Sequence, residues 1–591
     1  MLNVNLRAFH SYLRERKKGC PTVGPLRSPE GSLVTDPCIM GSIFVDAFAS
    51  VLVAGNPVAP EDHQLSSSVM DDVTLSYEGV HLVLRSLSES SSPGPDQIHP
   101  KLLKSCADVL ALPLSLIFRE SLLTGVLPER WKVSKISPIF KGGSRANPLN
   151  YRPVSLTATC CKVMERMIGK HIMDYLEGND LLSGGQFGFR QGHSTEDQLL
   201  LTYGDIIKRM DEGMMVDVVY MDYSKAFDVV NHGVLIQKLQ ALGFSPQVVA
   251  WVEAFLSGRS MYVSVSSQDS HVVPVSSGVP QGSVLGPILF LVYVNHLARG
   301  LSCKWYAYAD DFKLYWSYAR LGSDGPSWEL QSDLNSIARR SGSWNLKLNP
   351  DKCVIMRFGA GCGVTTADGG LSGYVLGDVE LRLVKYHKDL GVLVDSSLKF
   401  HAHINAIVGK ATGLSNQILR GTVCRDVGFM VTLFTSHIRP ILDYGCVVWN
   451  VGYIGDVAKL ERIQRRWTRE TRGMAGVDYR SRLKDMNLFS IYGRMIRSDM
   501  VKIWKAFNSD TDVGLANLLE QISHSSTRGH GFKLSVPRCR SEIRRRFWNV
   551  RCVRQWNSLP VDVVRAGSVE AFKVRLDCYL GDKLFDTIDG N

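Results

Sequence analysis

Hydrophobic residues between positions 216 and 394 follow two different periods. Apolar runs of the kind found in strands occur at 218–222 and around 306–315. Apolar residues at helical spacing predict helices around 234–242 and 288–294, and the second of these is apolar enough to be buried. The mixture predicts an α+β core for this part of the chain.

The regions on either side have other patterns. Residues 102–172 show helical periodicity interrupted by basic loops that contain proline and glycine. From Lys399 to Leu580 the periodicity is mostly helical, with basic helices predicted at ERIQRRWTRETR and SEIRRRFWNVRCVRQW. The first 90 residues have weak periodicity and clusters of serine, proline and glycine, which predict a linker and entry segment.

Composition narrows the class of protein and its partners. With 591 residues, the chain is long enough for about three to five domains. Its 45% hydrophobic and 21% charged residues exclude a wholly disordered chain. The 68 Lys and Arg residues outnumber the 57 Asp and Glu residues. The resulting net charge of +11 favours a polyanionic partner, nucleic acid before a membrane surface.

Cysteine usage and hydropathy indicate the compartment. The 13 cysteines lack C-x-x-C spacing, so we expect reduced thiols rather than a zinc site or an extracellular disulfide framework. The amino terminus carries charges where a signal peptide needs an apolar stretch. The longest uncharged stretch, 270–298, is interrupted by prolines, Gln281 and Asn295, which argues against a membrane span. We therefore expect an intracellular protein of the nucleus or cytoplasm, neither secreted nor embedded in a membrane.

Two adjacent acids are the first candidates for chemistry. In CKWYAYADDFKLYW, large apolar residues flank Asp310 and Asp311, the pattern of two strands joined by a tight turn. Adjacent carboxylates repel each other, so they favour a compensating cation, and a divalent metal ion is the obvious candidate. On this segment alone, a structural Asp-Asp turn is the favoured alternative.

A third acid, Asp222, ends an apolar strand 88 residues before Asp310. Two strands of one sheet that each end in aspartate can bring three carboxylates around two cations about 3.5–4 Å apart, the arrangement used for phosphoryl displacement. Asp228 is a fourth candidate. For Asp228, however, we favour a place in the first turn of a helix, where an acid complements the helix dipole.

A loop of small residues precedes the buried helix in SSGVPQGSVLGPILFLVYVNHL. A core helix behind a turn explains the apolar part of this segment. It leaves Pro280, Gln281 and Gly282 unexplained, because a loop of small residues lets a flat ligand approach the backbone closely.

Eight segments, taken in chain order, resemble the successive blocks of reverse transcriptases from non-LTR (LINE-type, jockey-like) retrotransposons. They are SSPGPDQIHPKLLK, PIFKGGSRANPLNYRPVSLTATCCKVMERMI, QFGFRQGHSTEDQL, YMDYSKAFDVVNH, GVPQGSVLGPILFLVYVNHL, YADD, LKLNPDKC and YHKDLGVLVD. The carboxyl end, RFWNVRCVRQWNSLPVDVVRAGSVEAFKVRLDCYL, is similar to the tail of jockey-like elements. The resemblance covers residues 91 to 580.

The resemblance implies a fold and a division of the chain. The fold is α+β, a right-hand polymerase with fingers, a ferredoxin-like palm and a helical thumb, followed by a basic and mostly helical C-terminal region. The implied segments are an entry segment (1–90), fingers (91–215), palm (216–394), thumb or connection (395–510) and C-terminal region (511–591). The reverse transcriptase domain as a whole is expected at about 120–395.

The resemblance also implies roles for individual residues. Asp222, Asp310 and Asp311 match the catalytic acids that bind two Mg²⁺ ions, assisted by the backbone carbonyl of Tyr223, and Phe227 matches the bulky gate that rejects a ribose 2′-OH. The other nucleotide-binding candidates are Gln281 and Gly282 of the loop, Arg152 and Lys141 of the fingers, and Lys352, which resembles a lysine assigned as general acid. The alternatives are surface positions for Arg152 and Lys352 and a core position for Phe227.

A basic stretch near the carboxyl end is a candidate nucleic-acid surface. Its members are Arg538, Arg540, Arg544, Arg545, Arg546, Arg551 and Arg554, interleaved with Phe547, Trp548 and, nearby, Trp556. The arginines can neutralise phosphates while the aromatic residues stack on bases. A solvated helix face over an aromatic core explains the pattern equally well.

The hypothesis drawn from these patterns is an RNA-directed DNA polymerase that extends a DNA 3′-OH on an RNA template with deoxynucleoside triphosphates. The first 90 residues leave no room for the upstream endonuclease of such elements, and no RNase H domain or Cys/His knuckle is evident. Two alternatives remain: a catalytically inactive, RNA-binding remnant of a retroelement, and an intron-type maturase.

Overall fold

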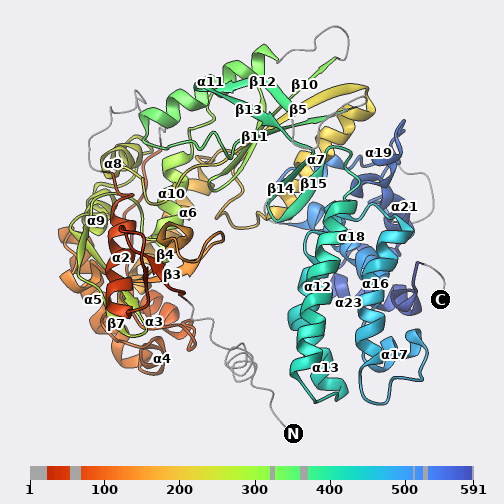
Figure 1. Cartoon of the computed structure of the whole chain (residues 1–591), viewed down its shortest axis with the longest axis horizontal. Coiled ribbons are helices and arrows are strands. Elements are labelled where there is room, and N and C mark those ends of the chain that lie inside the picture. The colour runs from red at the N-terminus through yellow and green to blue at the C-terminus, as the bar shows by residue number, and fades with distance from the viewer. Residues whose placement is uncertain are drawn as a thin grey trace.

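The computed structural model describes residues 23–53, 68–319, 327–359, 370–509, 513–522 and 530–588. The described elements form an arch (Figure 1). A six-stranded sheet lies at the top, a body of helices around a smaller sheet forms one limb, and a body of long helices forms the other.

The six-stranded sheet has the order β12-β13-β11-β5-β10-β9. Its strands are β5 (Met214–Met221), β9 (Lys304–Tyr308), β10 (Asp311–Ala319), β11 (Val354–Phe358), β12 (Gly370–Leu376) and β13 (Val379–Leu383). The strands predicted at 218–222 and around 306–315 are confirmed as parts of β5 and of the β9–β10 hairpin.

Alternate side chains of β5 enter two different hydrophobic cores, as the pleat of a strand requires. Val219 and Met221 pack against α10 (Leu285–Val294) and α11 (Trp328–Ser343). Val218 and Tyr220 pack on the opposite face with α7 (Thr195–Asp211). The sheet is therefore buried on both faces, and β5 lies at its centre.

The smaller sheet has the order β4-β3-β6-β7, with β8 also paired to β6. Its strands are β3 (Val133–Phe140), β4 (Tyr151–Leu156), β6 (Arg259–Val265), β7 (Gln268–Asp269) and β8 (Val273–Val275). The helices of this limb include α3 (Tyr77–Arg85), α4 (Pro100–Ser105), α5 (Ala107–Thr124), α6 (Thr159–Gly178), α8 (His232–Ala241) and α9 (Pro246–Leu256). The predicted helices at 234–242 and 288–294 are confirmed as α8 and α10.

This sheet differs from the predicted boundary at residue 216. Strands β6 to β8 lie inside the range 216–394, yet β6 pairs with β3, and β7 and β8 pair with β6 instead of with the large sheet. The chain leaves the large sheet after β5 and returns to it at β9. Parallel pairing of β3 with β6 is a long-range contact, which local periodicity does not reveal.

The predicted linker over the first 90 residues also differs from the structure. Helix α2 (Pro37–Ala49) packs on β6 through Met40, Phe44, Val45 and Phe48, and α3 packs against α5 and α6. Asp36 caps α2 by accepting the N–H groups of Cys38 and Ile39, and Pro37 occupies the first turn. This start signal was present in the sequence.

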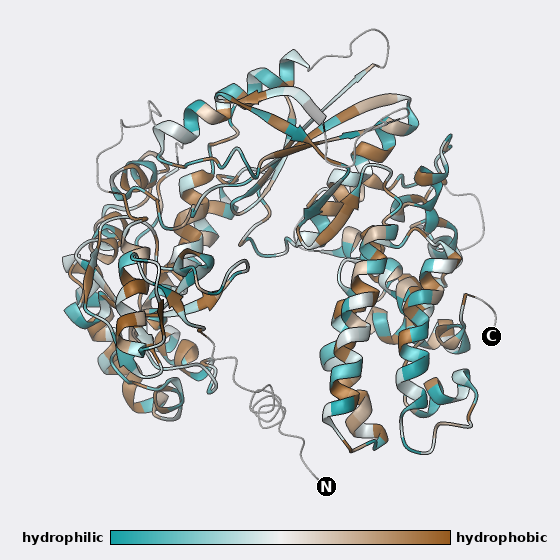
Figure 2. Cartoon of the chain, viewed as in Figure 1, coloured by the Kyte–Doolittle hydropathy of each residue, from teal (hydrophilic) through white to brown (hydrophobic). Residues whose placement is uncertain are grey.

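The second limb is helical, as predicted for residues after Lys399. A hairpin of β14 (Tyr386–Asp389) and β15 (Val392–Asp395) leads into it. Its main helices are α12 (His401–Gly421), α13 (Val427–Leu433), α14 (Arg439–Asp443), α15 (Cys446–Trp449), α16 (Ile454–Arg469), α17 (Tyr479–Asp485) and α18 (Ile491–Asn508). Hydrophilic and hydrophobic positions alternate along α12 and α16 (Figure 2), as expected for helices with one buried face.

The C-terminal region shares the core of this limb. Short helices α19 (Glu542–Arg546), α20 (Trp548–Arg551), α21 (Val553–Asn557) and α22 (Val561–Val564) precede α23 (Val569–Leu580), which packs on α18. Phe547, Trp548 and Trp556 are buried in the core that also contains Trp504. The predicted division at residue 510 therefore does not separate two cores. The long basic helix predicted at 541–556 is broken into short helices, with extended backbone at Phe547 between α19 and α20.

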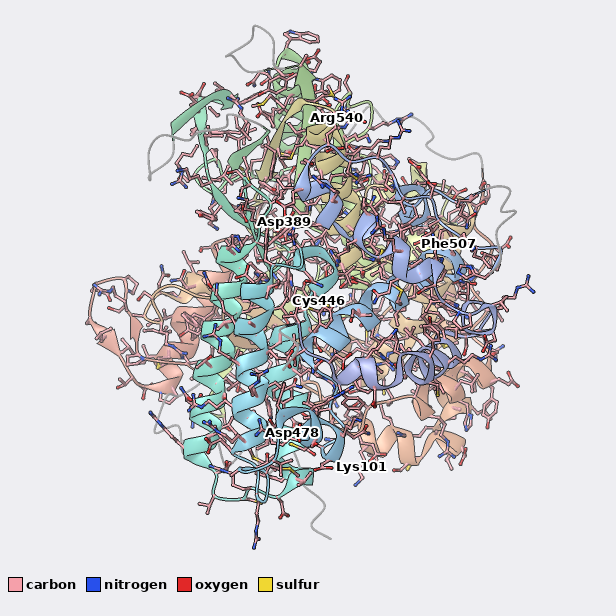
Figure 3. All side chains as sticks on the ribbon, turned by 90° about the vertical axis from the view of Figure 1, so that its right-hand side faces the viewer. Lys101, Asp389, Cys446, Asp478, Phe507 and Arg540 are labelled. Carbon is pink, nitrogen blue, oxygen red and sulfur yellow. The ribbon has the colours of Figure 1, made fainter. Side chains whose placement is uncertain are left out.

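A buried ion pair joins the helical limb to the large sheet. Lys313 of β10 donates to Asp389 of β14 at 2.6 Å, and both side chains are nearly inaccessible to solvent. The hydroxyl of Tyr203 in α7 donates to the same carboxylate oxygen at 2.6 Å. Asp389 lies where the sheet meets the helices (Figure 3). Burial lowers the pKa of Lys313, and the charge of Asp389 partly offsets this. Because the desolvation of two buried charges opposes their attraction, the pair fixes the geometry of this junction more than it stabilises the fold.

We expect the Lys313→Met variant to lose about 3–5 kcal/mol of unfolding free energy, because Asp389 is left buried without a cation. Urea unfolding followed by tryptophan fluorescence measures this. The matched control is Lys304→Met, on β9 of the same sheet. Lys304 is exposed and pairs with Asp205 of α7, so its loss is expected to cost less than about 1 kcal/mol. Equal losses in the two variants would contradict the structural role of the pair.

Candidate active site

The pairing of β5 with β10 brings the three predicted acids to one end of the large sheet. Phe312 lies opposite Met221, and continuing this register by one residue places Asp311 opposite Asp222. Asp311 also pairs with Tyr308, so Ala309 and Asp310 form a two-residue turn between β9 and β10. The turn predicted from the apolar flanks is confirmed.

Burial and neighbouring acids raise the pKa values of Asp310 and Asp311. The protein around Asp311, followed by the charges of Asp310, Asp389 and Asp222, raises the pKa of Asp311 to about 6 even though its side chain keeps an exposed surface. Burial is the main cause of a raised pKa at Asp310, and Asp222 adds to it. Within the described residues, no group of three or more His, Cys, Asp or Glu side chains is arranged as a metal centre. The charges of the acids thus act on one another, although the side chains are not gathered around one point.

Gln186 holds the turn that carries Asp310. Its side chain is 4% exposed, and its Oε1 accepts the N–H groups of Gly188 at 2.9 Å and Ala309 at 3.0 Å. Ala309 has φ of 59°, a strained conformation for a residue with a Cβ, so the turn needs such support. The neighbouring backbone pairs with β9, where Phe187 donates to Ala307 at 2.8 Å.

Cations surround the acids. Lys352 Nζ lies 3.3 Å from Asp222 Oδ2, and the charges of Lys141 and Arg152 act on Asp310. A recess of about 610 Å³ beside Tyr223 is lined by four lysines: Lys141, Lys225, Lys347 and Lys352. The sequence analysis missed Lys225 and Lys347, although both belong to segments that it singled out. The recess places positive charge next to the three carboxylates.

The side chain and the backbone of Tyr223 make separate contacts. The ring is buried, and its hydroxyl lies 3.0 Å from the hydroxyl of Ser341. Its backbone forms a bridge with Leu348 in which the hydrogen bonds are made by the residues on either side, Asp222 accepting from Asn349 and Ser224 donating to Lys347. The carbonyl of Tyr223 is not used in this bridge, which suits its predicted role at a metal ion.

Phe227 is half-buried beside the site. Its ring stacks on Phe290 of α10 with centroids 4.1 Å apart and meets Phe189 edge-on at 6.0 Å. The ring is therefore fixed by core contacts while part of its surface remains accessible. Core packing and a gating role are compatible at this position.

The loop at 280–282 is anchored to β4. The N–H of Ser155 donates to the carbonyl of Gln281 at 2.7 Å, and a Cβ on Gly282 would lie 2.6 Å from the Ser155 carbonyl. Gly282 also has φ of 122°, which only glycine adopts readily. The loop predicted to approach a ligand closely thus approaches the backbone of β4 in the smaller sheet.

Helix α10, which follows this loop, is capped by a residue from another helix. Glu165 of α6 is fully buried, and its Oε2 accepts the N–H groups of Val284 at 2.7 Å and Leu285 at 3.1 Å. A carboxylate at a helix N-terminus satisfies free donors and complements the dipole. The sequence analysis missed Glu165 because its partners lie about 120 residues away.

The favoured interpretation of Asp228 is wrong. Helix α8 begins at His232 and is capped by Asn231, so Asp228 lies outside its first turn. Instead, its carboxylate accepts the side-chain N–H of Gln281 at 2.7 Å. Burial raises the pKa of Asp228, and the hydrogen bond from Gln281 partly offsets this.

The arginines near the carboxyl end divide into two groups. Arg544 is buried and donates to Asn549, Arg551 forms two hydrogen bonds with the buried Asp499, and Arg546 pairs with Glu542. The exposed members are Arg538, Arg540, Arg545 and Arg554. Three of the seven predicted nucleic-acid contacts therefore serve the fold, and the buried aromatic residues have no face free for stacking on bases.

Comparison with known proteins gives the class of this domain. Residues 139–397 match the model of the family "Reverse transcriptase (RNA-dependent DNA polymerase)" and belong to it. This range contains the three acids, the loop at 280–282 and Gln186.

Relatives place the chain within that class. It is 28% identical over 422 residues to the RNA-directed DNA polymerase from mobile element jockey of Drosophila melanogaster, covering 68% of this chain and 44% of that protein. It is 30% identical over 397 residues to the probable RNA-directed DNA polymerase from transposon BS of the same species, covering 65% of this chain and 43% of that protein. The chain is thus similar to RNA-directed DNA polymerases of mobile elements and spans less than half the length of these two relatives. No helix in the described residues is long and apolar enough to cross a membrane.

We expect the contribution of Asp311 to thermal stability to fall as pH rises from about 4 to about 7. The folded-state pKa of Asp311 is raised above its unfolded value, so ionisation costs more in the folded chain, and the stability present at low pH is lost on passing through about 6. Asp311→Asn should therefore melt higher than wild type at pH 7, and this difference in melting temperature should shrink as pH falls towards 4. Added Mg²⁺ should raise the melting temperature of wild type more than that of the variant.

Differential scanning fluorimetry between pH 4 and pH 8 measures both effects. Asp269→Asn, at an exposed position on β7, is the control and should follow the wild-type profile. An Asp311→Asn profile identical to wild type would contradict the electrostatic account.

Gln186→Ala should lower the rate of any reaction at this site more than it weakens substrate binding, because it releases the turn of Asp310 without touching the lysine-lined recess. We expect a stability loss of about 1–3 kcal/mol from the two unpaired N–H groups. Steady-state kinetics together with urea unfolding measure the two effects. Gln191→Ala, an exposed glutamine in the same loop, should change neither, and a raised KM with unchanged kcat in Gln186→Ala would refute the positioning role.

Proposed function

We propose that this chain is an RNA-directed DNA polymerase that extends a DNA 3′-OH on an RNA template with deoxynucleoside triphosphates. One observation carries the proposal: three carboxylates and a recess lined by four lysines lie together at the end of β5 and β10, inside a reverse transcriptase domain. Phosphoryl transfer requires positioning and charge neutralisation more than covalent chemistry.

The carboxylates suit divalent metal ions, which reverse transcriptases use. Hard oxygen donors are the ligands that Mg²⁺ prefers, and the raised pKa values of Asp310 and Asp311 mark carboxylates that gain from a neutralising cation. We propose that Asp222, Asp310, Asp311 and the carbonyl of Tyr223 hold two Mg²⁺ ions. When bound, the ions would neutralise charge on the attacking and leaving oxygens.

The lysine-lined recess suits a triphosphate. Lys141, Lys225, Lys347 and Lys352 supply point charges, and Arg152 on β4 adds a guanidinium near Asp310. Lys352 lies closest to an acid, 3.3 Å from Asp222, so it is placed to protonate or neutralise a leaving pyrophosphate. We propose the same nucleotide site for Gln281 and Gly282, whose loop backbone is fixed against β4.

Phe227 is proposed as the group that excludes a ribose 2′-OH. Its ring cannot retreat, because Phe290 and Phe189 contact it. A rigid aromatic edge discriminates a deoxyribose from a ribose by steric exclusion.

Exposed arginines suit the nucleic-acid strands. Arg462, Arg466 and Arg469 line one face of α16, and α12 packs beside this helix with the exposed residues Lys410 and Arg420. Together with Arg538, Arg540, Arg545 and Arg554, these residues offer charge for phosphate contacts. We keep fingers, palm and thumb as the proposed parts, with the fingers sheet extended to include residues 259–275.

Primer extension tests the proposal. The purified chain, with a DNA primer annealed to a heteropolymeric RNA template, dNTPs and Mg²⁺, should add nucleotides. The Asp310→Asn, Asp311→Asn double variant should lose at least about a thousandfold in rate while keeping its fold and RNA affinity. RNA binding without extension by a folded wild-type chain would favour the inactive remnant instead.

A further inference from the structure

The side chain of Gln281 is hydrogen-bonded to Asp228, a residue that has no role in the nucleotide site proposed above. Its Nε2 donates to Asp228 Oδ1 at 2.7 Å. An ionised carboxylate has no proton, so only the NH₂ end of an amide can bind it. The carbonyl end of the Gln281 amide is then the end left for a substrate, and it can only accept a hydrogen bond.

The backbones on both sides of this contact are fixed. Ser277 Oγ donates to the Asp228 carbonyl at 2.8 Å, and a Cβ on Gly278 would lie 2.7 Å from that carbonyl. On the other side, Ser155 donates to the Gln281 carbonyl at 2.7 Å. Only the side-chain torsions of Gln281 remain adjustable.

Packing does not fix those torsions. Asp228 and Gln281 line a cavity of about 50 Å³ together with Ser155, Arg259 and Lys225. This volume has room for a few water molecules, so the amide has space to turn. The hydrogen bond to Asp228 is the contact that selects one orientation.

We propose that Asp228 is a positioning residue that orients the amide of Gln281, so that the Gln281 carbonyl oxygen is presented as a hydrogen-bond acceptor to the incoming nucleotide. This inference rests on the proposed function. Asp228 acts through Gln281 and has no separate contact with the nucleotide. Its loss affects nucleotide binding only while Gln281 is present.

A double-mutant cycle with single-nucleotide primer extension tests this. Asp228→Asn, whose amide can pair with Gln281 in either orientation, should raise KM for the dNTP about tenfold and leave kcat within about twofold. Gln281→Ala should have an effect of similar size. Adding Asp228→Asn to Gln281→Ala should cause no further change.

An exchanged pair provides the rescue. Gln281→Glu alone places two carboxylates against each other and should be more impaired than Asp228→Asn. Combining it with Asp228→Asn restores a donor at 228 and an acceptor at 281, with the net charge of the wild type. The pair should recover several-fold in kcat/KM over Gln281→Glu.

The control is Asp333→Asn, at a buried carboxylate that accepts the N–H groups of Ser302 and Cys303 away from the loop. It is expected to lower the melting temperature without raising KM. Multiplicative effects throughout the cycle and no rescue by the exchanged pair would overturn the positioning role in an active enzyme. No extension by a folded wild type would instead refute the proposed function, and the inference with it.

Discussion

Repulsion among three carboxylates is the constraint on which the rest of the site depends. The pairing of β5 with β10 is antiparallel, so the end of one strand meets the start of the other, and Asp222 and Asp311 must lie side by side. Burial and then the charges of neighbouring acids raise the pKa values of Asp310 and Asp311, which is the cost of holding them here. The surrounding lysines reduce that cost, and a substrate that brings metal ions and phosphates matches both signs of charge.

Polar side chains carry the site's geometry. Gln186 and Glu165 are buried and Asp228 is half-buried, and each binds backbone or side-chain groups of a loop of the candidate site from a different part of the chain. Their partners are polar groups that would otherwise be unpaired, so each contact gives specificity to a loop that hydrophobic packing alone leaves adjustable.

The sequence predicted elements that rest on local patterns. The strand ending at Asp222, the turn at Asp310 and the buried helix α10 follow from apolar spacing, and the structure has all three. It did not predict contacts set by distant residues. Three such contacts join segments that lie from 53 to more than 100 residues apart: the pairing of β3 with β6, the capping of α10 by Glu165, and the hydrogen bond between Asp228 and Gln281. The burial of Trp548 could not be predicted either, because a stretch of basic and aromatic residues fits a surface or a core equally well.

The ion pair of Lys313 and Asp389 has a mechanical consequence. It fastens the hairpin β14–β15 to the strand that begins at Asp311, so this hairpin moves with the large sheet. The chain between the hairpin and α12 is short, and Asp395 at its start accepts the N–H groups of Ser397, Lys399 and Phe400. The limb is fastened a second time, because Lys502 of α18 pairs with Glu196 and Asp197 of α7, the helix that packs on β5. The helical limb is therefore tied at two separate points to the sheet whose strands carry Asp222 and Asp311, and a displacement at either point is transmitted to the strand ends at which these acids lie.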